Sequence, residues 1–333
     1  MKRLFTIVSL VIIANIAISP VVLKADMFPT SSEHKREITK EYSVSSSPSL
    51  SIKNEFGKIK IIEGADDKII FKVTITGKGK NDDEAKKYAE TVNVDFKQNG
   101  NGISAKTTFG KINCNNCGRS VDYEVTVPKM TKYELENKYG DINMNNAYEP
   151  MVVNVEFGKF YANVISDIDL SMKYGGATIN KCGHMNIKSG FSKYKLGEVG
   201  SLSGKIEYDG FDIKELGSAD INSGFSNVDI DKLNKSLKAK GFSYGSLGID
   251  NVDSNFSEIK VDASFSKVKV SMNEKHNFKA ALYTSFGDIK TGRVVFYEKS
   301  LDKKDAIVGI AGKVKEPSAI VEISNSYGNI VFD

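Results

Sequence analysis

The stretch EFGKFYANVISDIDLSMKYGGATINKCGHMNIKSGFSKYKL, residues 156–196, decides the fold. Its aromatic residues Phe157, Tyr174 and Phe191 follow one another at a constant interval, with one ring at every seventeenth position. The same interval continues through Tyr208, Phe225 and Phe242. A fixed period of this length, repeated with similar local sequence, is the signature of a solenoid in which each repeat adds one rung to a stack.

The sequence around each aromatic residue predicts β-structure. Apolar residues recur three and five positions after the ring, as in Tyr194 and Leu196 after Phe191, and four positions before it, as in Ile187. This alternation has the period of a strand with one buried face, and it does not fit the 3.6-residue period of a helix. The phase changes at the Gly or Ser after each ring, which predicts a bend. We therefore expect an all-β, single-chain parallel β-solenoid (β-helix) with rungs of about 17 residues, stacked about 4.8 Å apart.

The aromatic column is predicted to be a structural ladder inside the stack. Its six members are Phe157, Tyr174, Phe191, Tyr208, Phe225 and Phe242. Inward packing explains a constant interval without any partner, so we expect Phe191→Ala to cost about 3–5 kcal/mol. The alternative is a column that faces solvent and serves as a ligand platform. A second column, Asn115, Asn145, Asn163 and Asn180, predicts hydrogen bonds from rung to rung.

Residues 1–25 resemble an export signal. Lys2 and Arg3 precede a largely apolar stretch from Leu4 to Ile18, and the small Ala25 precedes Asp26. An uncleaved membrane anchor is the alternative. Residues 26–47 are rich in Ser, Thr, Glu and Lys and are predicted to be a flexible linker. We expect no membrane span in the mature chain.

The remaining chain divides into a cap and the solenoid. Residues 48–130 are predicted to form an irregular, β-rich N-terminal cap with one short helix, which Asn81 begins and which carries acids in its first turn. Residues 131–333 are predicted to form the β-solenoid. Its spacing loosens after Phe265, and a segment at about 292–318 is predicted to be an insertion that leaves the stack as a loop or hairpin.

The charge balance argues against nucleic acid as a partner. Without Lys2, Arg3 and Lys24, the 46 basic residues fall to 43, against 42 acidic residues. A net charge near +1 and only four arginines give no basic surface for phosphate recognition.

The three cysteines admit a metal site, a redox site or a disulfide. Cys114 and Cys117 form a C-x-x-C motif, and Cys182 lies two residues before His184. In a solenoid, Cys117 and Cys182 lie three repeats apart, roughly 14 Å, which is too far for shared zinc ligation. A redox motif would open a helix, and this motif lies between strand and turn. We expect a possible local disulfide between Cys114 and Cys117, a buried thiol at Cys182, and neither metal nor cofactor.

The order of these features resembles a known family. A strand with an aromatic-Gly bend and a short acidic helix precede VDYEVTVPK at residues 121–129, ENKYGDI at residues 136–142, and serial aromatic-Gly-Asp/Lys-Ile units. This pattern resembles the bacterial β-strand-repeat family of unknown function, and it is similar to the GIN families of Bacteroidetes, candidate adhesin heads. The resemblance covers residues 49–333. Departures are the Ser after Phe191, Phe225, Phe242 and Phe265, and the C-terminal insertion. The resemblance implies an exported β-solenoid linked to envelope stress or surface adhesion, without catalytic residues.

Three functions remain open. The first is a non-enzymatic cell-envelope protein, in the periplasm or on the surface of a bacterium, with a structural or interaction role and an unidentified envelope protein or glycan as partner. The second is a surface adhesin or glycan-binding module, for which the scattered Tyr161, Tyr244 and Tyr283 are the candidate exposed aromatics. The third is a polysaccharide-active β-helix, for which Asp229, Asp231 and Asp250 are the candidate acids. We expect no enzymatic activity, because paired acids in an alternating strand ordinarily face solvent.

Overall fold

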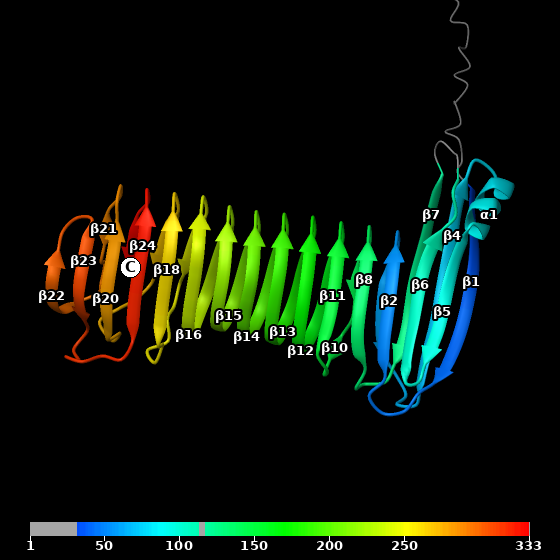
Figure 1. Cartoon of the computed structure of the whole chain (residues 1–333), viewed down its shortest axis with the longest axis horizontal. Helices are drawn as coiled ribbons and strands as arrows, with labels where there is room; N and C mark the ends of the chain where they lie inside the picture. The colour runs from blue at the N-terminus through cyan, green and yellow to red at the C-terminus, as the bar shows by residue number, and fades with distance from the viewer. Residues whose placement is uncertain (1–31, 113–116, 333) are drawn as a thin grey trace, which may run out of the picture.

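The protein is a long stack of parallel strands with a cap at its N-terminal end (Figure 1). The computed structural model describes residues 32–112 and 117–332. In the centre of the stack, one long bent strand forms most of each rung. These strands are β12 (Lys159–Lys173), β13 (Gly176–Gly190), β14 (Lys193–Glu207), β15 (Gly210–Gly224) and β16 (Asn227–Ser243). The predicted all-β solenoid is confirmed.

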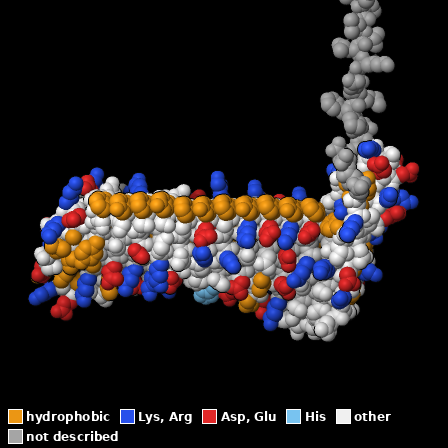
Figure 2. All heavy atoms as spheres, turned by 45° about the horizontal axis from the view of Figure 1, so that its top comes forward, with side chains coloured by type: hydrophobic (Ala, Val, Ile, Leu, Met, Phe, Trp, Pro, Cys, Tyr) orange, Lys and Arg blue, Asp and Glu red, His pale blue; other side chains and the backbone are white. Residues whose placement is uncertain are grey.

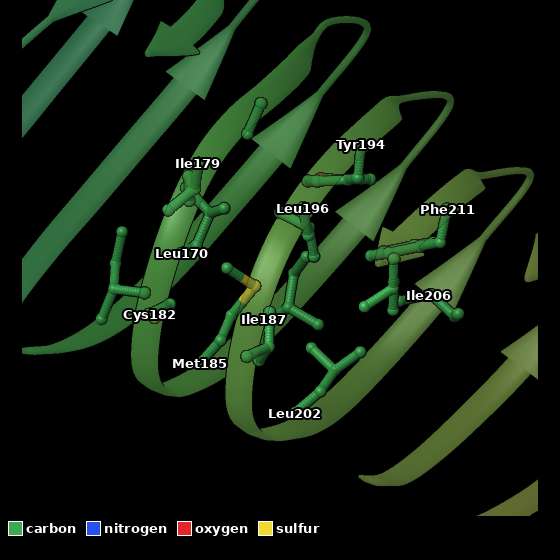
Figure 3. Close-up of a cluster of buried hydrophobic side chains, with 14 of the residues drawn as sticks. Leu170, Ile179, Cys182, Met185, Ile187, Tyr194, Leu196, Leu202, Ile206 and Phe211 are labelled. Atoms are coloured by element: carbon green, nitrogen blue, oxygen red, sulfur yellow. The ribbon is translucent and has the colours of Figure 1, made fainter. Parts of the chain in front are cut away.

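The register between central rungs is constant and sets the core. Lys159 lies opposite Gly176, and Gly176 lies opposite Lys193, so each rung is offset from the last by seventeen positions. Like positions therefore stack, and the column three residues after each ring is buried. It contains Phe160, Ala177, Tyr194, Phe211 and Val228. Figure 3 shows Tyr194 and Phe211 in this core, with the column of Ile179 and Leu196 beside them.

The solenoid begins earlier than the predicted residue 131. β2 (Ser49–Glu55) and β3 (Ile59–Glu63) form the first rung, because they pair in parallel with β8 (Lys132–Lys138) and β9 (Ile142–Asn143). The next rung continues through β10 (Asn146–Ala147) and β11 (Met151–Glu156) to β12. The segment between β3 and β8 leaves the stack to build the cap.

The cap joins the first rung by parallel pairing and extends it with antiparallel pairs. Its strands are β4 (Lys68–Gly79), β5 (Val92–Asn99), β6 (Gly102–Phe109) and β7 (Gly118–Val127). β7 pairs in parallel with β3 and antiparallel with β4, while β6 pairs in parallel with β2 and antiparallel with β5. The predicted helix is α1 (Asp82–Glu90), and the Asn81 side chain accepts a hydrogen bond from the Glu84 amide at 2.9 Å.

The predicted linker at residues 26–47 is wrong for residues 32–43. Residues 32–43 form β1 (Ser32–Ser43), which pairs antiparallel with β4 along its whole length. Ile38 and Tyr42 pack against the core from alternate positions of this polar strand. The polar composition belongs to an edge strand with one face in water, and charged edges of this kind resist unwanted pairing.

The register changes at β16, and this shift displaces Phe242 from the aromatic column. Between β15 and β16 the offset grows from seventeen to nineteen positions through two single-position shifts. Gly224 is therefore opposite Ser243, and the ring after Phe225 is Tyr244. Phe242 keeps the constant interval but lies in the core with 0 % exposure.

The C-terminal end is not a simple continuation of the stack. The remaining strands are β17 (Ser246–Ile249), β18 (Glu258–Ser264), β19 (Lys267–Val270), β20 (Phe278–Thr284), β21 (Ile289–Lys290), β22 (Phe296–Asp302), β23 (Ala306–Ala311), β24 (Ile320–Ser326) and β25 (Ile330–Phe332). β24 lies between β18 and β20 and pairs in parallel with both, so the order in space differs from the order in the chain. The predicted insertion at 292–318 contains the hairpin β22–β23, and it stays on the sheet because β23 pairs antiparallel with β20.

Candidate functional site: an exposed aromatic stripe

A single row of aromatic rings runs along one edge of the stack and is visible as the continuous orange band in Figure 2. Neighbouring centroids are 4.5–5.1 Å apart and neighbouring planes lie within 12° of parallel. We call this row the aromatic stripe. In spatial order it contains Phe56, Tyr139, Phe157, Tyr174, Phe191, Tyr208, Phe225, Tyr244, Phe265, Tyr327 and Phe286.

The rings face solvent, which corrects the predicted inward ladder. Exposed fractions run from 42 % at Phe56 to 66 % at Phe286. Of the six predicted members, Phe157, Tyr174, Phe191, Tyr208 and Phe225 belong to the exposed stripe, and Phe242 belongs to the core. Of the three tyrosines predicted as candidate exposed aromatics, Tyr244 belongs to the stripe, and Tyr161 and Tyr283 lie outside it.

The backbone explains why the rings point outward. Ten of the eleven stripe residues, all except Phe286, have φ between 51 and 60°, the left-handed region. The bend therefore lies at the aromatic residue itself, and its side chain projects from the corner. This conformation costs a non-glycine residue about 1–2 kcal/mol. Stacking of neighbouring rings contributes about 0.5–1.5 kcal/mol per pair and offsets much of that strain.

The residue after the ring must fit against the previous rung. At Gly158 a β-carbon would lie 2.0 Å from the carbonyl oxygen of Gly140, so this corner admits glycine only. Other rungs have Ser at this position, and its hydroxyl joins two rungs. Ser226 Oγ donates to the Gly224 carbonyl at 2.9 Å and accepts from the Asp209 amide at 3.1 Å. Both solutions hold successive corners in register, which keeps the rings stacked.

One rung carries a buried carboxylate beneath the stripe. Asp209 is 4 % exposed and follows Tyr208. Its oxygens accept from the amides of Ser192 at 2.8 Å and Glu207 at 3.0 Å. Burial outweighs these hydrogen bonds and raises the pKa of Asp209 to about 6.

The stripe is large for the surface of a single chain. Ten steps of 4.5–5.1 Å give a length between about 45 and 51 Å. Aromatic side chains present about 150–250 Å² each, so eleven half-exposed rings expose on the order of 1,000 Å². The largest apolar patch on a typical monomer is about 300–600 Å², and larger patches mark interaction sites.

The ring faces are already occupied. Each internal ring is covered on both faces by its neighbours, so only ring edges point to solvent. At the N-terminal end, Phe109 packs edge-on against Phe56, and the Arg119 guanidinium lies 5.0 Å from the Phe109 centroid. Sugar recognition uses exposed aromatic faces, and an internal ring of this stripe offers none.

Phe and Tyr alternate strictly along the stripe. The alternation holds for the order of the rings in the stack and not for their order in the sequence. Tyr327 is inserted between Phe265 and Phe286 because β24 lies between β18 and β20. The five Tyr hydroxyls are therefore two steps apart, about 9–10 Å. Within residues 32–112 and 117–332, no protein group is hydrogen-bonded to any of these five hydroxyls.

The candidate metal and cysteine residues do not converge. Cys182 is a buried free thiol, and burial raises its pKa to about 12. His184 points to the surface and its Nδ1 lies 2.6 Å from Ser201 Oγ. Among the described residues, no three His, Cys, Asp or Glu side chains form a metal-binding group. Cys114 lies outside the described residues, so its disulfide with Cys117 stays a prediction.

Of the candidate catalytic acids, Asp229 and Asp231 lie on the outward face of β16, and the exposed Asp250 directly follows β17. Asp231 is paired with Lys214 at 2.9 Å. Partial burial, with Asp250 and Asp212 nearby, raises the pKa of Asp229. The Asn ladder is present in part: Asn180 donates to Asn163 at 3.0 Å, and Asn163 donates to Asn146, not to the predicted Asn145. Asn115 lies outside the described residues.

A column with triad chemistry lies elsewhere on the stack. Asp167, His184 and Ser201 occupy the same register position in three successive strands. In the described part of the chain, no hydrogen bond joins Asp167 to His184, so the imidazole has no carboxylate to orient it. Nucleophilic catalysis is not supported by this arrangement.

Fold and stripe together define a β-solenoid whose distinguishing surface is a row of stacked, outward-facing aromatic rings. The family model of Toastrack DUF4097 matches residues 48–332, so the chain belongs to this family. The predicted repeat family of unknown function is thus confirmed in its broad form, while the similarity to the GIN families stays a prediction. No curated protein matches the chain.

The solved structures to which the chain is similar are distant from it. A candidate cell adhesion protein from Clostridium sporogenes is 10 % identical and has a TM-score of 0.24, with 90 % of this chain and 99 % of that chain covered. A candidate adhesin from Bacteroides fragilis is 12 % identical, with a TM-score of 0.35 and coverage of 90 % and 97 %. A candidate lipid binding protein from Parabacteroides distasonis is 10 % identical, with a TM-score of 0.35 and coverage of 89 % and 95 %. In the described residues, no helix is long and apolar enough to cross a membrane.

Proposed function

We propose that this chain is an exported, non-enzymatic β-solenoid of the bacterial cell envelope, in the periplasm or on the cell surface, that acts by contact through the aromatic stripe. The observation that carries the proposal is the stripe itself: eleven stacked rings expose on the order of 1,000 Å² of apolar surface. Exposing apolar surface to water is unfavourable. Binding of a partner that covers the stripe is therefore favoured by a free energy roughly proportional to the apolar area covered.

Export is supported by the sequence of residues 1–25, and a contact role is supported by the chemistry of the stack. Outward charges are paired between neighbouring rungs, as in Lys181 of β13 with Glu198 of β14 at 2.7 Å. Glycan binding is less well supported, because the ring faces that would stack on sugars are covered by neighbouring rings.

In-cell photo-crosslinking tests this function. A benzophenone analogue of phenylalanine placed at Phe191 should crosslink to a macromolecular partner in intact cells, because the ring edge is covered in the functional state. The same analogue at Tyr283, which is 45 % exposed but off the stripe, serves as the matched control. Absence of a crosslink at Phe191, or equal crosslinking at both positions, would contradict a contact role for the stripe.

A further inference from the structure

The pattern of the stripe is the same from both ends. It has eleven rings that alternate from Phe56 to Phe286, so Tyr208 is the central ring and each ring has a counterpart of its own type at the same distance on the other side. A surface with this property can meet an identical surface turned end for end. We propose that the stripe binds the stripe of a second copy of this chain, in an antiparallel two-fold dimer; this rests on the proposed function and deepens it by naming the partner.

The two-fold arrangement satisfies the Tyr hydroxyls. In full antiparallel overlap, Tyr139 meets Tyr327 of the second copy, Tyr174 meets Tyr244, and Tyr208 meets itself. A phenol donates and accepts, so each facing pair can form a hydrogen bond that the single chain does not supply. The Phe rings meet Phe rings, which keeps apolar edges together. A partner without such groups would leave five hydroxyls buried and unpaired, at a free-energy penalty for each.

The residues beside the rings are complementary in size and charge. The residue immediately before the ring is charged at the first four rings of the stripe and small at the last five. The charged set is Glu55, Lys138, Glu156 and Lys173, and the small set is Gly224, Ser243, Ser264, Ser326 and Ser285. We place the two-fold axis in the plane of the interface, at right angles to the stripe. The residues that precede the rings then lie on the same side of the stripe in both copies. The charged end of this row in one copy therefore lies over the small end of the same row in the other.

Individual pairs follow from that register. Lys173 meets Ser243 and Glu156 meets Ser264, so long side chains extend over small ones. In the row two residues after each ring, Lys58 meets Asp288, which is already paired with Lys304 of its own chain at 3.0 Å. Two like-charged meetings remain, Glu207 with itself at the axis and Lys159 with Lys267. Most of the contact therefore avoids repulsion without requiring a partner of different sequence.

Shape and area support the same partner. β7 lies beside Phe56 at Val121, whose amide donates a hydrogen bond to the Phe56 carbonyl. The N-terminal part of β7, from Gly118 to Val121, extends beyond the level of Phe56. The cap thus rises past the stripe at one end, as Figure 1 shows, and gives the edge the outline of a letter L. Two such outlines interlock when antiparallel, each cap closing the C-terminal end of the other stripe. About 1,000 Å² per copy also exceeds the roughly 800 Å² per partner of a standard interface.

Sedimentation velocity on the chain from Asp26 onward tests the dimer. The described residues form one hydrogen-bonded sheet around one core, so this chain retains the folded body without the apolar N-terminal stretch. We expect a dimer at micromolar concentration. Replacing Phe191, Tyr208 and Phe225 by Asn, which tolerates the left-handed conformation, should raise the dissociation constant at least 100-fold. The same change at Tyr148, Tyr283 and Tyr297, exposed aromatics off the stripe, should leave it within threefold.

Crosslinking of single-cysteine variants with a short bis-maleimide tests the register, since the rings hold the two backbones apart. Tyr208→Cys should link to itself, whereas Tyr139→Cys should link poorly alone and well when mixed with Tyr327→Cys. Efficient self-linking of Tyr139→Cys would indicate a parallel dimer and would overturn the proposal. The proposal would also be overturned if the wild-type chain stayed monomeric in sedimentation at 100 times the micromolar concentration at which we expect the dimer. A monomer that still crosslinks through Phe191 to another molecule in cells would leave the proposed function standing and this inference refuted.

Discussion

At the residue scale, the stripe combines exposure with an unfavourable backbone conformation. Phe191 is 52 % exposed, has φ of 57°, and stacks on Tyr174 at 5.0 Å and Tyr208 at 4.6 Å. Its contribution to stability therefore comes from two ring contacts and not from burial in a core. Phe242, which shares the same interval in the sequence, contributes through complete burial.

These two residues make a matched pair for a stability measurement. We expect Phe191→Ala to lower the free energy of unfolding by about 1–3 kcal/mol, because it removes two stacked ring contacts. Phe242→Ala should lower it by about 3–5 kcal/mol, because it leaves a cavity in the core. Urea denaturation of the two variants at protein concentrations that keep the chain monomeric gives both values. Equal losses would show that the stripe is buried.

Asp209 gives the stack a dependence on pH. Its pKa of about 6 in the folded state is above its ordinary value of 3.8, so the folded state binds the proton more tightly than the unfolded state. This group therefore favours folding increasingly as pH falls from about 6 toward 3.8, by up to about 3 kcal/mol. Counted from low pH, this same difference is the cost of keeping the buried carboxylate charged at pH 7.

Ser occupies the corner position of Asp209 in two neighbouring rungs, at Ser192 and Ser226. Asp209→Ser should therefore fit the corner and remove the dependence of stability on pH. The variant should be more stable than wild type at pH 7, and the difference should shrink as pH approaches 4. Asp212→Ser, at an exposed aspartate in the next strand, is the control. Denaturation curves between pH 7.5 and 4.5 give the comparison, and a difference that does not change with pH would refute it.

At the element scale, the C-terminal hairpin protects the end of the sheet. β23 pairs with β20, and β22 forms the outer edge with the charged residues Glu298, Lys299 and Asp302. Charged edge strands of this kind limit pairing with other chains. The hairpin depends on a close approach at Gly309, where a β-carbon would lie 2.3 Å from the Glu298 carbonyl oxygen.

Gly309→Ala should therefore detach β22 while the rest of the stack stays folded. Amide exchange in residues 296–302 should increase by at least tenfold, with exchange in β12–β15 unchanged. Gly224→Ala is the matched control, since a β-carbon there lies 3.8 Å from Ser243 Oγ, an ordinary contact. If both variants exchange alike, the close approach at Gly309 does not hold the edge strand.

At the scale of the whole molecule, local periodicity is enough to predict the solenoid but not its outline. Tyr194 and Phe211 are predicted to face the core because a period of two identifies the inward face, and they stack there. The outward stripe escapes prediction because a left-handed aromatic corner is rare, and a phase change does not say which residue makes the bend. The position of β24 escapes it because a long interval signals an insertion without saying where the chain re-enters.

A constant interval in the sequence does not by itself place a ring in the aromatic stripe. Phe242 is predicted to belong to the column because it keeps the interval, but two single-position shifts in β16 give that place to Tyr244. The useful signal is the apolar residue expected three positions after a corner ring: Leu247 stands there after Tyr244 and is buried opposite Val228, whereas Gly245 stands there after Phe242. Local corner chemistry thus identifies the stripe members better than a fixed spacing does.

The alternation of Phe and Tyr also restricts how such a protein can grow by gene duplication. A duplication that added one rung would place two like rings side by side and would shift the centre of the pattern away from a single ring. A duplication of two rungs preserves both the alternation and the odd number of rings. Related chains that keep the alternation should therefore differ in length by even numbers of rungs. Tyr327 follows Phe286 in the sequence but lies between Phe265 and Phe286 in the stack, so the alternation that a duplication must preserve is the one in space.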